Sequence, residues 1–242
     1  MIGPELRLTG VGKRFDWLPD PLLDELSFTV APGEVLALVG PSGVGKSTLL
    51  RMIGGVDTVF TGHVTIDGVE AGVAPPAGFV FQDPRLLPWL TALENIRAVR
   101  PETGRDEAVA LLARVGLAGY EQAYPHELSG GMQRRVAIAR ALSVNPRLLL
   151  LDEPFVSLDR ALAREMELLL TDLLDADHPT AVLVTHLNED AAMLADRAVV
   201  LAGRPARIAL DYRFESRRGS RDAVEREHIA SRLAEAALES VR

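Results

Sequence analysis

The sequence predicts an α/β fold built around a mainly parallel sheet. Segments such as Leu148–Leu151 and Ala181–Val184 are short and continuously apolar, which is typical of parallel strands buried on both faces. Segments with the spacing of amphipathic helices alternate with them along the chain. A chain of 242 residues with this pattern is compatible with one large domain or two small ones.

Turn residues and apolar runs place the individual elements. Ala31-Pro32-Gly33-Glu34 predicts a turn between two strands. The expected strands are Leu26–Val30, Val35–Val39, His63–Asp67, Gly78–Phe81, Arg147–Leu151, Thr180–Thr185 and Arg197–Leu201. The expected helices are Lys46–Ile53, Arg105–Val115, Met132–Ser143, Arg160–Leu174 and Glu189–Ala195.

Two segments stand outside this alternation. Residues 84–145 lack strand patterns and are expected to form a helical subdomain within a single domain that spans residues 1–210. Residues 211–242 form a charged tail that is expected to be helical. Apolar residues are spaced among its charges, so it is either an amphipathic helix docked on the body or a frayed end.

Composition argues against several classes of protein. Cysteine is absent, which excludes disulfides, cysteine-ligated zinc and a thiol nucleophile. The net charge of −8 makes nucleic acid an unexpected partner. No apolar run approaches the ~20 residues of a membrane-spanning helix, and the first ten residues lack the apolar core of a signal peptide. We therefore expect a cytoplasmic location.

A phosphate-binding loop follows the strand expected at Val35–Val39. Residues 40–47 read Gly-Pro-Ser-Gly-Val-Gly-Lys-Ser and fit the pattern G-x-x-x-x-G-K-[S/T]. Backbone N–H groups of such a loop surround phosphate oxygens, Lys46 reaches the β- and γ-phosphates, and the Ser47 hydroxyl binds Mg²⁺. An ordinary glycine-rich turn is the alternative, but the flanking strand and helix favour a nucleotide site. The expected nucleotide ligands here are Gly40, Pro41, Ser42, Gly43, Val44, Gly45, Lys46, Ser47 and Thr48.

Two carboxylates end the apolar segment 148–151. Asp152 and Glu153 precede Pro154, and charges at the end of a buried strand are costly unless something satisfies them. Asp152 suits a direct or water-mediated Mg²⁺ contact, and Glu153 suits a general base that activates water. A strand that leaves the core into a polar turn is the alternative.

A second anion-binding turn is expected inside the helical subdomain. Leu-Ser-Gly-Gly-Met-Gln occupies residues 128–133 and opens a predicted helix. Ser129 can cap this helix, and Gly130 and Gly131 leave N–H groups accessible to an anion. A plain N-capped helix explains the same residues, and the pattern alone does not decide between the two.

The three motifs together resemble those of the ATP-binding-cassette (ABC) ATPases. The phosphate-binding loop, Leu-Ser-Gly-Gly-Met-Gln and then Leu-Leu-Leu-Leu-Asp-Glu-Pro occur in the order and spacing of that family. The resemblance extends from about Glu5 to Ile208. It implies a P-loop NTPase core of the RecA-like type, with a helical subdomain and an N-terminal antiparallel β portion.

Smaller motifs extend the resemblance. Gln82 resembles the glutamine of the family's Q-loop, residues 157–159 resemble its D-loop, and His186 resembles its switch histidine. Lys13-Arg14-Phe15 resembles the segment whose aromatic ring stacks on adenine, and Trp17 is an alternative stacking partner. Four predicted strands thus each end in a polar group, and ligands of open α/β sheets bind at this carboxyl edge.

The resemblance implies a homodimer in the ATP-bound state, with ATP and Mg²⁺ as cofactors. Two cassettes of this family pair head to tail, so residues of one chain complete the nucleotide site of the other. The residues expected to act across this interface are Ser129, Gly130, Gly131, Gln133 and Asp159. The implied catalytic residues are Glu153, His186 and Gln82, and the implied metal ligands are Ser47, Gln82 and Asp152.

A shorter motif resembles one branch of the family. Leu-Leu-Pro-Trp at residues 86–89, followed by Glu94-Asn95, is similar to importer cassettes for nitrate, sulfonate, taurine or pyrimidine precursors of thiamine. This implies integral membrane permease subunits as partners, a solute-binding protein as an indirect partner, and the cytoplasmic face of the cell membrane as the location. The apolar run suits a partner helix, or Trp89 covers the core of the helical subdomain. A non-transport ABC ATPase and an exporter cassette are the alternatives.

Overall fold

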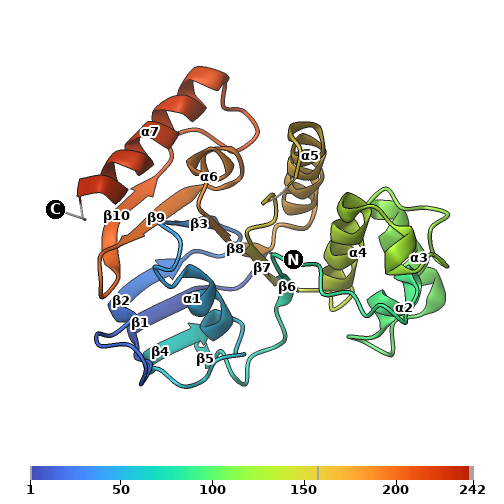
Figure 1. Cartoon of the computed structure of the whole chain (residues 1–242), viewed down its shortest axis with the longest axis horizontal. Helices are drawn as coiled ribbons and strands as arrows, with labels where there is room; N and C mark the ends of the chain where they lie inside the picture. The colour runs from blue at the N-terminus through green and yellow to red at the C-terminus, as the bar shows by residue number, and fades with distance from the viewer. Residues whose placement is uncertain (1, 157, 240–242) are drawn as a thin grey trace.

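A computed structural model describes residues 2–156 and 158–239 of the chain. It contains two sheets (Figure 1). The larger has the order β10-β9-β3-β8-β7-β6, in which every neighbouring pair is parallel except β9 and β10. Its strands are β3 (Val35–Val39), β6 (Gly78–Val80), β7 (Leu148–Asp152), β8 (Thr180–Thr185), β9 (Arg197–Ala202) and β10 (Arg207–Arg213). The predicted α/β fold is confirmed.

The smaller sheet is antiparallel and has the order β2-β1-β4-β5. Its strands are β1 (Leu6–Lys13), β2 (Leu23–Val30), β4 (Thr61–Ile66) and β5 (Val69–Glu70). This is the N-terminal antiparallel portion that the resemblance implies. Helix α1 (Lys46–Ile53) packs between the two sheets, with Leu49, Leu50, Met52 and Ile53 fully buried.

Alternate residues of the parallel strands enter two different cores. In β3, Leu36 and Leu38 pack towards α1 and the antiparallel sheet, whereas Val35, Ala37 and Val39 pack towards the helices on the opposite face. Both faces are therefore apolar, which is why the pattern is continuous and lacks the alternation of a half-exposed strand.

A helical lobe lies beyond the β6 edge of the larger sheet, on the right of Figure 1. It contains α2 (Ala92–Arg97), α3 (Arg105–Arg114), the short 3₁₀ helix η1 (Pro125–Glu127) and α4 (Gly130–Leu142). Ile96, Leu112 and Val136 form part of its core. Helix α2 is too short to show helical periodicity, but Thr91 and Glu94 form a capping box at its start.

The remaining helices cover the face of the larger sheet opposite α1. They are α5 (Arg160–Asp177), α6 (Asn188–Leu194) and α7 (Ala223–Glu239). Helix α7 packs against α6 and β9, and it buries Ile229 and Leu233 while Val224 and Leu238 stay exposed. Of the two alternatives for the tail, the docked helix is therefore correct. The start of the tail at residue 211 needs correction, because β10 pairs with β9 as far as Arg213.

In the part of the chain that the structure describes, no helix combines the length and apolar character needed to cross a bilayer.

Replacing Leu183 by alanine is expected to lower the free energy of unfolding by about 2–5 kcal/mol, because the truncation leaves a cavity inside the sheet. Leu183 of β8 is fully buried, whereas Leu168 of α5 is 51% exposed. Leu168→Ala is therefore the matched control and should change this free energy by less than about 0.5 kcal/mol. Urea titrations of both variants measure the difference, and equal losses would contradict the packing described.

Candidate functional site

The phosphate-binding loop connects β3 to α1 in a conformation that requires glycine. Gly45 has φ 110°, a region that side chains with a Cβ rarely adopt. A Cβ on Gly40 would lie 2.3 Å from the carbonyl oxygen of Leu201. Lys46 donates hydrogen bonds to the carbonyl oxygens of Gly40 and Pro41 at 2.7 and 3.0 Å. The loop therefore curls around the ammonium group at the start of α1.

Two expected magnesium ligands meet next to this loop. The Ser47 hydroxyl donates a hydrogen bond of 2.8 Å to Oδ1 of Asp152, which ends β7. A hydroxyl and a carboxylate oxygen are hard donors of the kind that Mg²⁺ prefers. Within the described ranges, no three His, Cys, Asp or Glu side chains gather as a metal cluster. A magnesium ion at Ser47 and Asp152 would therefore need further oxygen ligands, which nucleotide phosphates and water can supply.

Burial shifts the pKa values of Lys46, at the start of α1, and of Asp152, at the end of β7. Lys46 is 5% exposed, and this burial lowers the pKa of its ammonium group, although the nearby Glu153 and Asp152 oppose the shift. Burial also raises the pKa of Asp152, while the hydrogen bond from Ser47 acts in the opposite direction. Burial thus disfavours the charged form of each group. An anionic ligand beside Lys46, or a cation beside Asp152, would favour the charged form again.

Glu153 and His186 lie side by side at the ends of β7 and β8. Oε2 of Glu153 is 3.2 Å from Nδ1 of His186. Glu153 has φ 46°, a left-handed conformation that costs about 1–2 kcal/mol for a residue other than glycine. Its backbone N–H donates to the carbonyl oxygen of Val184 at 2.9 Å, which holds the turn in this shape. Such strain is found where a side chain must be aimed at a ligand.

An open cleft of about 530 Å³ lies beside Glu153 and the phosphate-binding loop. Lys46, Ser47, Glu153 and Gln82 line one part of it, and Phe15, Trp17 and Leu22 line another. The rings of Phe15 and Trp17 stack with centroids 5.2 Å apart. The cleft therefore offers charged groups for phosphates and aromatic faces for a base. Phe15 and Trp17, the two residues considered as stacking partners of adenine, both line this cleft.

The Ser-Gly-Gly turn stands at the start of α4, in the helical lobe. Ser129 caps the helix by accepting a hydrogen bond of 3.3 Å from the Met132 N–H. The side-chain amide of Gln133 donates to the carbonyl oxygens of Pro125 and Leu128 at 2.9 and 3.1 Å. Both side chains thus stabilise the turn itself.

The turn is not part of the clefts that border the phosphate-binding loop. One of these contains Lys46 and Glu153, the other contains Ser47 and Asp152, and neither is lined by residues 129–131. Asp159 also lies outside them and caps α5, accepting hydrogen bonds of 3.0 Å from the N–H groups of Ala161 and Leu162. Ser157, in the expected D-loop, lies outside the described residues.

Comparison with known proteins identifies the family. Residues 23–156 match the family model described as "ABC transporter". The chain belongs to the ABC transporter family. It is similar to an aliphatic sulfonates import ATP-binding protein, SsuB 2 of Burkholderia lata, with 47% identity over 190 residues, which cover 77% of this chain and 70% of the relative.

Further relatives carry similar names. The aliphatic sulfonates import ATP-binding protein SsuB 1 of Xanthomonas axonopodis pv. citri is 42% identical over 218 residues, covering 87% of this chain and 86% of the relative. SsuB of Bacillus subtilis is 43% identical over 192 residues, covering 77% and 75% of the two chains. The solved dimer of the ATP-binding cassette MJ0796 in a post-hydrolysis state with ADP and Pi superimposes with a TM-score of 0.77, at 31% identity, over 88% of this chain and 100% of that one.

Two residues of this ABC cassette lie outside the sequence motifs and hold the turns next to Glu153 and His186 in place. The Arg134 guanidinium donates to the carbonyl oxygens of Pro154 and Val156 at 2.9 and 2.6 Å. It thereby ties α4 of the helical lobe to the turn that follows Glu153. Arg134 directly follows the Leu-Ser-Gly-Gly-Met-Gln motif, and this position is the only feature of the sequence that could have indicated its role.

The second such residue is Asp190, at the start of α6. Its Oδ2 accepts a hydrogen bond of 2.7 Å from the Thr185 hydroxyl, which in turn accepts one of 3.0 Å from the Leu187 N–H. These bonds fix the turn that carries His186. Burial raises the pKa of Asp190 to about 6, so this carboxyl is much easier to protonate than one in water.

This shift predicts a pH dependence of stability. The folded protein holds the Asp190 proton up to about pH 6, whereas the unfolded chain releases it near pH 3.8. The contribution of Asp190 to the free energy of unfolding therefore falls as pH rises between these values, by roughly 3 kcal/mol. Asp190→Asn keeps an acceptor for Thr185 and removes the charge. As pH rises from about 4 to about 7, the free energy of unfolding of the variant should therefore increase relative to that of the unmodified protein. Urea titrations at several pH values measure both free energies, and a difference between them that does not change with pH would contradict the prediction.

Proposed function

We propose that this cassette hydrolyses ATP to power an ABC importer for a small organic anion, such as a sulfonate, taurine or nitrate, or for a pyrimidine precursor of thiamine. The observation that carries the proposal is the pairing of Glu153 with His186 beside Lys46 and the Ser47–Asp152 pair. The similar proteins, which are named aliphatic sulfonates import ATP-binding proteins, support the solute class.

The residues divide the chemistry among them. Backbone N–H groups of the phosphate-binding loop and Lys46 bind the phosphates. Ser47, Asp152 and Gln82 would hold Mg²⁺, which would supply positive charge to stabilise the transferred phosphoryl group. Glu153 accepts the proton of the attacking water. His186 orients the Glu153 carboxylate and faces the γ-phosphate.

The active form is a homodimer with ATP at the interface. Ser129, Gly130, Gly131 and Gln133 of one chain complete the nucleotide site of the other, and Asp159 lies at the junction. Two observations support this arrangement: the Ser-Gly-Gly turn does not line the clefts beside the phosphate-binding loop of its own chain, and the similar MJ0796 cassette is dimeric.

The partner that couples hydrolysis to transport docks at residues 86–90. Trp89 is 69% exposed, so it does not cover the core of the helical lobe. The side chain of the buried Asn95 holds this segment in place: Oδ1 accepts from the Leu87 N–H at 2.8 Å, and Nδ2 donates to the Leu90 carbonyl oxygen at 3.0 Å. A rigid turn that presents tryptophan to solvent suits a helix of a membrane permease. Such a complex places the cassette at the cytoplasmic face of the membrane, where a solute-binding protein acts only through the permease.

Glu153→Gln is expected to bind ATP and dimerise while its turnover falls by about 10²–10⁴-fold, because the amide cannot accept the proton of water. Glu235→Gln, on the exposed face of α7, is the matched control and should keep normal turnover. Phosphate release measures hydrolysis, and size-exclusion chromatography with ATP measures dimerisation. Near-normal turnover of Glu153→Gln would remove this residue from the role of base.

Trp89→Ala is expected to lower recovery of the membrane partner by about tenfold or more, because an exposed aromatic anchor of an interface carries much of its binding energy. The assay is affinity purification of the tagged Glu153→Gln cassette from gently solubilised membranes of its host with Mg-ATP. Tyr120→Ala, at an exposed aromatic of the same lobe, is the control and should leave recovery unchanged. Recovery of a soluble complex without any membrane protein would favour the non-transport alternative.

A further inference from the structure

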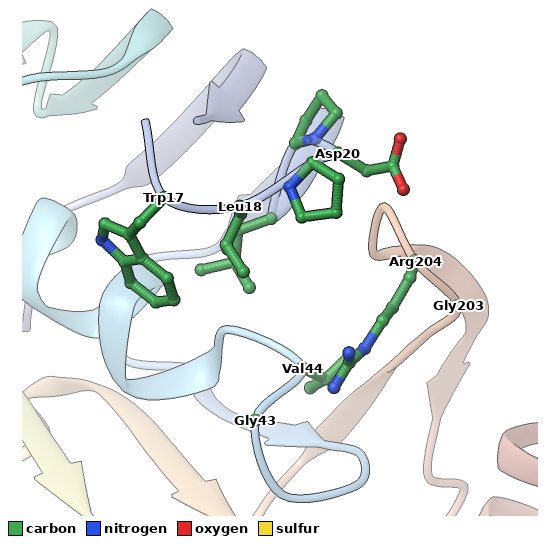
Figure 2. A pocket seen from close by; sticks show the side chains of 10 residues that line it. Trp17, Leu18, Asp20, Gly43, Val44, Gly203 and Arg204 are labelled. Carbon is green, nitrogen blue, oxygen red and sulfur yellow. The ribbon is translucent and has the colours of Figure 1, made fainter. Parts of the chain in front are cut away.

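A second cavity lies next to the nucleotide cleft (Figure 2). It has a volume of about 310 Å³ and is enclosed by the 17–22 loop, by Gly43 and Val44 of the phosphate-binding loop, and by the β9–β10 turn at Gly203 and Arg204. A cavity of this size accommodates a small organic molecule.

This cavity is distinct from the part of the cleft that takes phosphates. Lys46, Ser47 and Glu153 line the nucleotide cleft and do not line the cavity. Conversely, Gly203 and Arg204 line the cavity and do not line the cleft. A ligand in the cavity would therefore contact the outer side of the phosphate-binding loop.

The walls of the cavity are mostly apolar and held by backbone hydrogen bonds. The Ala206 N–H donates to the Leu22 carbonyl oxygen at 2.9 Å, and the Leu22 N–H donates to the Lys13 carbonyl oxygen at 2.7 Å. These bonds tie the 17–22 loop to the β9–β10 turn. The apolar lining consists of Trp17, Leu18, Pro19, Pro21, Leu22 and Val44. Because these hydrogen bonds hold the loop and the turn in place, binding would require little ordering of the chain.

Arg204 is exposed and places a positive charge at the edge of this apolar lining. Figure 2 shows its side chain reaching from the β9–β10 turn towards Val44, across from Trp17. Among the residues that the structure describes, none forms a hydrogen bond or ion pair with the Arg204 guanidinium. Asp20 also lines the cavity, and Figure 2 shows its carboxylate beside the β9–β10 turn. The guanidinium is therefore available to an anion.

We propose that this cavity is a second ligand site, which binds a small amphipathic organic anion. The ligand carries a sulfonate or carboxylate group on a short aromatic or alkyl body. Two oxygens of the acidic group accept the parallel N–H donors of Arg204, and the apolar body packs on Trp17 and the proline and leucine side chains.

Such a site is coupled to nucleotide binding by a shared wall. Trp17, Leu18, Leu22 and Gly43 line both the cavity and the nucleotide cleft. An occupant that shifts these residues changes the affinity for nucleotide, and nucleotide changes the affinity for the occupant by the same factor. The site thus provides a means for a small anion to regulate the cassette.

Tryptophan fluorescence tests the proposal directly. The chain has two tryptophans, Trp17 and Trp89, so Trp89→Phe leaves a single reporter in the wall of the cavity. Titration of this variant with benzenesulfonate should give a saturable change in Trp17 emission. The neutral benzenesulfonamide is the matched ligand control, and its affinity should be lower by a factor of about ten or more. No saturable change, or equal binding of both compounds, would overturn the proposal.

A pair of arginine variants assigns the anion to its partner. In the Trp89→Phe background, Arg204→Gln should weaken benzenesulfonate binding by about tenfold or more. Arg207→Gln should change it by less than about twofold, because Arg207 lies in the same hairpin, pairs with Asp24 at 2.6 Å and does not line the cavity. Equal effects of the two substitutions would contradict a specific role of Arg204. Binding of ADP to both variants verifies that they are folded.

Titration in the presence of ADP separates the cavity from the nucleotide cleft. If the two sites are distinct, the apparent Kd for benzenesulfonate reaches a plateau as the ADP concentration rises. An apparent Kd that rises in proportion to ADP without limit would place the probe in the nucleotide cleft and overturn the proposal. Neither measurement requires hydrolysis or a membrane partner, so the result is independent of the proposed transport function.

Discussion

Burial of the central parallel strands on both faces is the constraint on which this structure depends. Residues of β3, β7 and β8 alternate between the core that contains α1 and the core formed with the helices on the opposite face. Neither face can accept a charged side chain without a large desolvation cost. Polar groups are therefore confined to the carboxyl ends of the strands, where the sheet meets solvent. The phosphate-binding loop, Asp152, Glu153 and His186 all occur at this edge.

The same constraint explains why Glu153 is strained and why Lys46 and Asp152 are buried. The turn at Glu153 needs a left-handed backbone conformation to follow a buried strand immediately. Lys46, at the start of α1, and Asp152, at the end of β7, lose solvation because both are buried at this edge. A charged nucleotide and a metal ion would offset these costs, which would link ligand binding to the electrostatic stability of this edge.

The helical lobe carries the Ser-Gly-Gly turn and is hydrogen-bonded to segments at the edge of the sheet. Its Ser-Gly-Gly turn does not line the clefts beside the phosphate-binding loop of its own chain. Arg134 and Arg140 connect α4 to the turn after Glu153 and to the segment after Gln82. The lobe thus contacts the backbone on both sides of the nucleotide cleft. The exposed Trp89 belongs to this lobe, so the partner proposed to dock there would be connected to the carboxyl edge of the sheet through Arg134 and Arg140.

The sequence by itself determined the strands and helices that are buried or strongly periodic. The bounds of β3, β8 and α1 were predicted to the residue, because continuous apolar runs and a glycine loop leave few alternatives. Strands β1 and β10 were missed. Gly10 and Gly12 interrupt β1, and β10 is an edge strand with few buried positions, so neither has the pattern of a buried strand.

Only the tertiary structure decided which distant residues meet. Ser47 and Asp152 are separated by 105 positions and share a hydrogen bond, and the roles of Arg134, Asp190 and Arg204 depend entirely on their surroundings. The docking of α7, the exposure of Trp89 and the cavity beside Trp17 were likewise not determined by the sequence pattern. The physical reason is that motifs arise from local backbone requirements, whereas burial, pairing and cavities arise from packing between segments that are remote in the chain.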